Sequence, residues 1–278
     1  ALYTNTTGTQ NTACGRTALY SNTTGISNTA SGQGALYSNT TANNNTASGK
    51  DALYTNTTGA YNTASGQGAM YANTTALGNT ASGYTALATN TTGNYNTAYG
   101  YQALKANTTG IHNTACGYNG LYLNTTGEYN TGCGHQAGQN ITTGDYNACL
   151  GAYAYPSSAT VNGEIVLGDS NVGTLRCNTQ TISSLSDARD KVEVEPSPLG
   201  IDFINTLNPV KFKWETREGN SKDGTHEIGF IAQELQAVQK ESNTEYLKMV
   251  IDENPDRLEA SYGQLVPILV QAIKELSA

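Results

Sequence analysis

The sequence predicts a mainly β fold, a β-solenoid of 17-residue coils in a parallel homotrimer, followed by a small α+β domain that ends in a coiled-coil helix. Three observations lead to this prediction. A 17-residue repeat runs without insertion through residues 1–153. Val, Phe and Trp are absent from that stretch but present after it. The last apolar run of the chain has coiled-coil spacing.

The repeats keep the same residue types at fixed positions. Position 11 is Asn and position 15 is Gly in all nine copies, while positions 5–7 read Asn-Thr-Thr in eight of them. A long fixed period is the signature of a solenoid, in which each residue meets its own kind in the next coil. The nine copies begin at Ala1, Ala18, Ala35, Ala52, Ala69, Ala86, Ala103, Gly120 and Ala137.

The composition of residues 1–153 excludes an ordinary globular core, because most repeats offer one Leu or Met and little other aliphatic area. Abundant Asn, Gly and Thr disfavour helix and favour short strands, tight turns and ladders of identical side chains. A disordered low-complexity tract is the alternative, and the strict register argues against it. Because a small coil encloses only Ala, Thr and Ser, we expect Leu at position 2 and Tyr at position 3 to pack between chains.

Charge and cysteine content exclude several classes of function. The chain has a formal charge of −8, which disfavours nucleic acid and anionic membranes as partners. No apolar run is long enough for membrane insertion. Cys14, Cys116 and Cys133 share position 14 with serines, so we interpret them as ladder residues rather than metal ligands or disulfides. The sequence indicates no metal and no cofactor.

A β-rich connector is predicted over residues 154–185, with short strands at 163–168 and 172–177. Residues 186–278 then form a separate domain that contains every Phe and the single Trp of the chain. Its pattern predicts a short helix over 199–207, a strand over 210–214, a strand leading into a helix over 227–238, and a hairpin around the segment DENPD. This domain therefore has the residues for a true hydrophobic core.

The final segment, SYGQLVPILVQAIKEL, is a predicted helix. Its apolar residues step by three and four, which is typical of a coiled-coil seam between subunits. The seam consists of Tyr262, Leu265, Leu269, Ala272 and Leu276. Val266, Val270 and Ile273 could instead pack the helix onto its own domain, and the sequence leaves both arrangements open.

Four segments resemble the endosialidase-type intramolecular chaperone family. They are SDARDK at 186–191, LNPV at 207–210, GFIAQE at 229–234, and the terminal YGQL with AIKEL. Members of this family lie at the C-terminus of phage tail spikes and fibres, trimerise, template the upstream β-fold and release themselves by autoproteolysis. The resemblance covers residues 186–278. The repeats resemble, more loosely, those of phage tail fibres and of trimeric bacterial adhesins.

The resemblance implies a catalytic Ser186–Lys191 dyad that cuts the Leu185–Ser186 bond once per chain, as a single-turnover serine autoendopeptidase. Lysine can serve as the base only if its pKa falls well below about 10, which burial at a trimer interface could cause. Asp190 departs from the apolar residue common in the family and would hold Lys191 protonated. The alternative is a capping Ser186 and a surface Lys191. No enzyme activity is predicted for the repeats.

These observations predict a segment of a homotrimeric phage tail fibre, carried on the virion and facing the host surface. Its expected partners are other copies of itself and a host receptor, for which a glycan is one candidate. Tyr95, Tyr129 and Tyr146 at position 10 are the candidate glycan contacts, because exposed aromatic rings can stack on sugars. A cellular trimeric adhesin and an ice-binding solenoid, with Thr ladders at positions 6, 7 and 12, are the alternatives.

Overall fold

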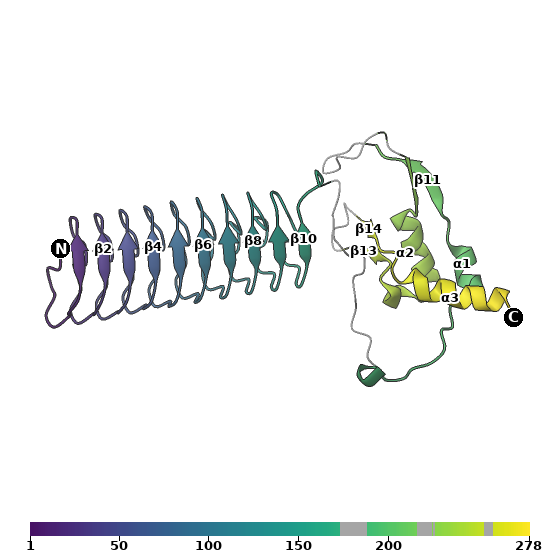
Figure 1. Ribbon diagram of the computed structural model, residues 1–278, viewed down its shortest axis with the longest axis horizontal. Helices are drawn as coiled ribbons and strands as arrows, with labels where there is room; N and C mark the ends of the chain where they lie inside the picture. Colours follow the sequence, from purple (N-terminus) through teal and green to yellow (C-terminus); the bar gives the residue numbers. More distant parts are fainter. Residues whose placement is uncertain (173–187, 216–223, 225, 253–257) are drawn as a thin grey trace. The chain divides into compact units, whose positions relative to one another are not determined.

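The computed structural model describes residues 1–172, 188–215, 224, 226–252 and 258–278. The chain divides after Val172 into two compact units, and each is described by itself (Figure 1). The first unit is the solenoid. The second contains the helices and two small sheets.

Ten short strands form one parallel sheet in sequential order (Figure 1), which confirms the predicted solenoid. Neighbouring strands pair residues that lie 17 apart, as in Thr29 with Thr46 and Thr46 with Thr63. The strands are β1 (Thr12–Cys14), β2 (Thr29–Ser31), β3 (Thr46–Ser48), β4 (Thr63–Ser65), β5 (Thr80–Ser82), β6 (Thr97–Tyr99), β7 (Thr114–Cys116), β8 (Thr131–Cys133), β9 (Ala148–Leu150) and β10 (Ile165–Leu167).

The ladder continues beyond the nine repeats into the segment predicted as a connector. Ile165 in β10 pairs with Ala148 in β9, again 17 residues upstream, so the predicted strand at 163–168 is confirmed as the rung of a further coil. The second strand predicted there, at 172–177, lies almost wholly outside the described residues.

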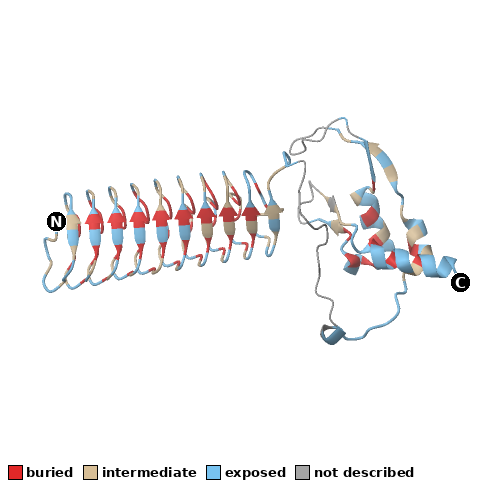
Figure 2. Cartoon of the chain, viewed as in Figure 1, coloured by how far each residue is buried: buried red, intermediate tan, exposed pale blue. Residues whose placement is uncertain are grey.

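The solenoid core is made within a single chain. Figure 2 shows buried residues recurring at the same place from coil to coil. Ala at positions 1 and 13 and Leu or Met at position 2 are fully buried from the second coil onward, as in Ala86, Leu87 and Ala98. The expectation that Leu at position 2 packs between chains is therefore wrong.

Backbone geometry explains this difference. Residues at position 2 have a left-handed backbone, with φ of 51° at Leu87 and at Leu104, so simple strand alternation does not apply there. Both Ala at position 1 and the following Leu consequently point inward. The tyrosines of position 3 stack on one another within the chain, with ring centroids 4.9–5.2 Å apart. Those rings are Tyr3, Tyr20, Tyr37, Tyr54 and Tyr71.

Two ladders of buried Asn side chains run along the interior. At position 5, Asn90 Nδ2 donates to Asn73 Oδ1 at 3.2 Å and to the Gly93 carbonyl at 2.9 Å. At position 11, the Asn96 backbone N–H donates to Asn79 Oδ1 at 2.8 Å, and Asn96 Nδ2 donates to the Gly110 carbonyl at 2.8 Å. Each Asn thus satisfies polar groups of its own coil and its neighbours, which accounts for the constancy of position 11.

Glycine at position 15 is required by both conformation and space. Gly100 has a φ of +136°, which L side chains rarely adopt. A methyl group on Gly100 would also collide with the carbonyl of Gly117 in the next coil. Both requirements exclude a side chain at this turn, which accounts for Gly in all nine copies.

The core changes in the eighth and ninth coils. Position 2 of the ninth coil is Gly138, and position 5, Asn in the other repeats, is Ile141. A methyl group on Gly138 would lie 2.7 Å from Leu121 Cδ2 and 3.3 Å from Ile141 Cδ1. Leu121 and Ile141 therefore fill the volume that Leu occupies in other coils, and the position-5 Asn ladder ends at Asn124.

The second unit has the elements that the sequence predicts. The predicted helix, strand, strand–helix segment and hairpin are confirmed, with β11 pairing β12 and β13 pairing β14 in antiparallel fashion. The elements are η1 (Ala188–Asp190), α1 (Ile201–Thr206), β11 (Val210–Lys213), β12 (His226–Gly229), α2 (Ala232–Glu241), η2 (Glu245–Leu247), β13 (Val250–Ile251), β14 (Glu259–Ala260) and α3 (Leu265–Leu276). Their shared core contains Phe203, Leu235, Leu247, Met249, Leu265 and Ile268.

Candidate functional site

Three of the four family-like segments meet in the second unit. Asn208, just before β11, donates from Nδ2 to Glu234 Oε2 in α2 at 3.1 Å. The Phe230 backbone N–H donates to the Tyr262 hydroxyl at 3.3 Å, and the two rings make an edge contact with centroids 5.4 Å apart. A methyl group on Gly229 would lie 3.0 Å from the Tyr262 hydroxyl. The segments around 208, 230 and 262 therefore act as one structural cluster.

Glu275 in α3 caps the N-terminus of α1. Its Oε2 accepts a hydrogen bond from the Ile201 backbone N–H at 2.7 Å, and its Oε1 accepts one from Gln271 Nε2 at 2.9 Å. These two bonds, the backbone bond first, lower the pKa of the Glu275 carboxyl. A methyl group on Gly200 would collide with that carboxylate. Sequence reasoning missed this cap, although the lack of a Ser, Thr, Asp or Asn before Ile201 was a signal for it.

Helix α3 has one buried and one exposed apolar face. Leu265, Ile268 and Ala272 lie in the core of their own unit. The other apolar residues of the helix are 43–71% exposed and form what we call the α3 stripe. The α3 stripe consists of Val266, Leu269, Val270, Ile273 and Leu276.

This arrangement divides the predicted seam. Of its residues, Leu269 and Leu276 lie on the α3 stripe and Tyr262 is exposed, but Leu265 and Ala272 pack inside the unit. Val266, Val270 and Ile273, suggested as the alternative domain-facing set, are exposed. The exposed apolar face of α3 therefore lies at a different angle around the helix from the predicted seam. Ile268 shares a helix face with Leu265 and Ala272, and it is the core residue that the predicted seam did not include.

The predicted catalytic dyad is only partly within the described residues. Leu185 and Ser186 lie outside them. Lys191 is exposed directly after η1, and its backbone N–H donates to the Ala188 carbonyl at 3.3 Å. The roles of Ser186 and Lys191 therefore stay predictions.

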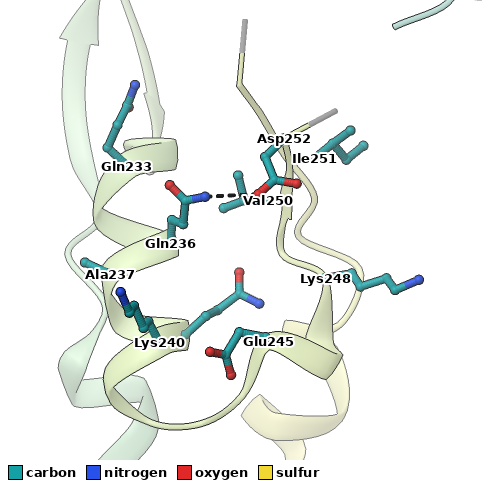
Figure 3. A pocket seen from close by; sticks show the side chains of 10 residues that line it. Gln233, Gln236, Ala237, Lys240, Glu245, Lys248, Val250, Ile251 and Asp252 are labelled. Atoms are coloured by element: carbon teal, nitrogen blue, oxygen red, sulfur yellow. Dashed lines mark hydrogen bonds between the residues drawn. The ribbon is translucent and has the colours of Figure 1, made fainter. Parts of the chain in front are cut away.

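A polar cleft of about 740 Å³ lies between α2 and the segment that runs through η2 to β13 (Figure 3). Gln236 Nε2 donates across it to Asp252 at 3.1 Å, and Lys240, Glu245 and Lys248 add charges of both signs. The lining residues that the structure describes include no Ser, Cys or His. Its amides and mixed charges are suited to polar recognition.

The candidate glycan contacts form a stacked ladder. Tyr95, His112, Tyr129 and Tyr146 follow one another at position 10, with ring centroids 4.9–5.1 Å apart and planes within 14° of parallel. The two inner rings, His112 and Tyr129, have neighbours against both faces, so chiefly their edges and the Tyr129 hydroxyl face solvent. Sequence reasoning missed His112, which a comparison of all residues at position 10 would have found. A second ladder at position 16 contains Tyr84, Tyr101, Tyr118 and His135.

Among the described residues there is neither a metal-binding cluster nor a membrane-spanning helix. In that part of the chain, no group of three or more His, Cys, Asp and Glu side chains is placed to hold a metal ion. No helix among the same residues has the length and apolar character needed to cross a membrane.

Comparison with protein families gave one match. Residues 186–244 match the family model described as chaperone of endosialidase. No curated protein and no solved structure matches the chain. The matched stretch contains the segments at 186–191, 207–210 and 229–234 and ends before α3, and within it Asn208 and Glu234 make the hydrogen bond described above. The chain therefore joins a β-solenoid to a region similar to the chaperone of endosialidase.

Proposed function

We propose that residues 186–278 are a folding and assembly module that brings three copies of the chain together and sets the register of a fibre-forming solenoid. The observation that carries this proposal is the chaperone-family match after a solenoid whose coils repeat every 17 residues. Because successive coils are alike, copies displaced by one coil pair almost equally well. A globular module with a single arrangement removes that ambiguity, and coils can then form from a fixed starting point.

The α3 stripe is the surface that we assign to subunit contact. Its five side chains are aliphatic. Complete burial of one such side chain stabilises a protein by roughly 1.5–3 kcal/mol, because apolar area is removed from water. Apolar residues that recur three or four positions apart along a helix can pack against a parallel helix from another copy of the chain. The buried face of α3 meanwhile keeps each subunit folded.

Light scattering and gel mobility of heated and unheated samples test the module. We expect a trimer for the intact chain and a folded monomer for Ile273→Asp, because a carboxylate in the α3 stripe opposes its burial. Lys240→Asp, on the exposed side of α2, is the control and should stay trimeric. A wild-type monomer would contradict the proposal.

We further propose that assembly activates cleavage between Leu185 and Ser186. The Ser186 hydroxyl attacks the Leu185 carbonyl, and its proton passes through Lys191 to the Ser186 nitrogen as the amide bond breaks. Water then hydrolyses the resulting ester and frees the Leu185 carboxylate and the Ser186 hydroxyl. The start of the family match at residue 186 supports this position. Ser186→Ala and Lys191→Ala should each give an uncut trimer; equal cutting of Ser186→Ala would exclude the dyad.

The proposed setting is a phage tail fibre that contacts a host receptor, with a cellular trimeric adhesin as the alternative. At position 10 the stacked rings offer three Tyr hydroxyl groups and the His112 ring nitrogens, so a glycan would bind there chiefly by hydrogen bonds. Cell adsorption by the triple Ala variant of Tyr95, Tyr129 and Tyr146 tests this contact. Unchanged adsorption would remove these residues as the receptor site.

A row of threonines supports ice binding as a second candidate function. Thr63, Thr80 and Thr97 at position 12 are exposed and in register on one sheet. The Thr ladder at position 6 is less available, because hydroxyls such as that of Thr91 donate to the backbone of the next coil. Thermal hysteresis that is lost in Thr80→Lys would support ice binding, and its absence in the wild type would exclude it.

A further inference from the structure

Cys116 and Cys133 are direct partners on neighbouring strands. They pair in register between β7 and β8, on the outward-facing side of the sheet. Cys116 is exposed and Cys133 is half-buried. Neighbouring strands lie about 4.8 Å apart, which is within the range of roughly 4.4–6.8 Å between the Cα atoms of a disulfide. The two backbones are therefore close enough for a disulfide between these thiols.

The chemistry of the two sulfurs differs from that of the other described thiols. Burial, and then the charge of Cys116 and a hydrogen bond between the two thiols, raise the pKa of Cys133. Cys116 is consequently the more accessible nucleophile, with Cys133 beside it. Cys14 has Ser31 as its partner on β2. Cys149 lies in the core, where burial raises its pKa to about 12.

We propose that Cys116 and Cys133 form a thiol–disulfide exchange site that covalently ties the seventh coil to the eighth. The Cys116 thiolate attacks a low-molecular-weight disulfide, such as oxidised glutathione, and one glutathione thiolate leaves. Cys133 then loses its proton and attacks the Cys116 sulfur, which releases the second glutathione. Two protein thiols are oxidised to one disulfide, one glutathione disulfide is reduced to two thiols, and the protons pass to the departing thiolates.

The position of this pair gives the bond a structural consequence. In the eighth coil, Gly120 and Gly132 occupy positions 1 and 13, where most other coils have buried Ala. The eighth coil therefore has fewer methyl groups in its core than its neighbours. A disulfide on its outer face would restrain the coil where internal packing is thinnest. This inference concerns the solenoid alone and goes beyond the proposed assembly function.

Peptide mass mapping of the folded full chain after incubation with oxidised glutathione tests the site. We expect a Cys116–Cys133 peptide pair that has lost two hydrogens, a glutathione adduct on Cys14, and unmodified Cys149. In Cys133→Ser, glutathione should stay on Cys116, because no neighbouring thiol displaces it. Its release should be slower than in the wild type by a factor of about ten or more. Serine stands at position 14 in four other coils, so this variant should keep the fold.

A second measurement uses only the wild-type chain. Phenylarsine oxide, which requires two adjacent thiols, should bind the reduced protein and protect Cys116 and Cys133 from alkylation while Cys14 reacts. Stable glutathione adducts on both paired cysteines would overturn the proposal. A disulfide between the Cys116 residues of two copies, in place of the internal bond, would also overturn it.

Discussion

In the solenoid, a core side chain packs against the same residue type one coil away, whereas in the C-terminal unit each core side chain meets different ones. Leu87 lies in a row of position-2 residues, Leu or Met in eight coils. Phe203, Met249 and Ile268 come from separate segments of the chain and fill one shared core. The repeated arrangement gives stability without a unique register, and the irregular arrangement gives a unique structure from few residues.

The hydrogen bonds differ in the same way. Along the solenoid, nearly identical bonds recur from coil to coil, as in Asn90 to Asn73 and Asn107 to Asn90. In the C-terminal unit, the Asn208–Glu234 and Ile201–Glu275 bonds each join segments distant in sequence. A change in the solenoid is therefore expected to act on one coil and its neighbours, while a change in the second unit acts on the whole unit.

The largest effect is expected for Ile268→Asp. Ile268 is almost completely buried, and an unpaired carboxylate there should destabilise the unit by more than about 4 kcal/mol. If the C-terminal unit sets the register, this variant should also fail to recover its solenoid after dilution from denaturant, as followed by circular dichroism. Lys240→Asp is the control and should refold. Normal refolding of the solenoid in Ile268→Asp would show that the two units fold independently.

The next effect is expected for Asn90→Ala. This change leaves Asn73 Oδ1 and one Asn107 amide proton without their partners, whereas the Gly93 carbonyl keeps the bond that Asn79 Nδ2 donates. At about 1–3 kcal/mol for each of the two buried groups, the free energy of unfolding should fall by roughly 4 kcal/mol. Urea denaturation measures it. Thr92→Ala, on the exposed position 7 of the same coil, should change it by less than about 0.5 kcal/mol.

A somewhat smaller loss is expected for Leu87→Ala. The structure buries Leu87 completely within its own chain, so its truncation leaves a cavity and costs about 2–4 kcal/mol. Leu123→Ala removes the same atoms from an exposed side chain and should cost less than about 1 kcal/mol. A loss of subunit association with unchanged stability of the single chain would instead support the packing between chains that the sequence suggested.

The period of the repeats was sufficient to predict the solenoid, but not which side chains face inward. Alternation along a strand assigns faces only where the backbone is extended. Here positions 2, 10 and 17 adopt left-handed φ values, for example 51° at Leu87, 58° at Tyr95 and 55° at Gln102. At these turns the side chains no longer alternate between the inside and the outside of the coil. The inward Leu and the stacked Tyr of position 3 follow from those turns and not from composition.

In the C-terminal unit, the elements could be predicted but the contacts between them could not. The apolar pattern of α3 allows two faces, and only the packing of Ile268 against the common core selects one. The Asn208–Glu234 and Phe230–Tyr262 bonds join segments whose approach depends on the whole fold. The dyad prediction rests on Ser186, which lies outside the described residues, so it depends on the biochemical tests.

The smallest effect is expected at Glu275, and it depends on pH. Hydrogen bonds from Ile201 and Gln271 lower the pKa of this carboxyl in the folded state, so the folded chain binds its proton less readily than the unfolded chain. The resulting stabilisation is complete above the ordinary glutamate pKa and is lost as the pH falls below about 4. Glu275→Gln keeps an oxygen that can accept from the Ile201 N–H but removes the charge. We therefore expect the melting temperature of the C-terminal unit in Glu275→Gln to be slightly lower than in the wild type at pH 7 and equal to it at pH 3. Gly200→Ala, which pushes the carboxylate away, should lower the melting temperature at pH 7 in the same way. An equal difference between Glu275→Gln and wild type at both pH values would mean that the cap does not act through its charge.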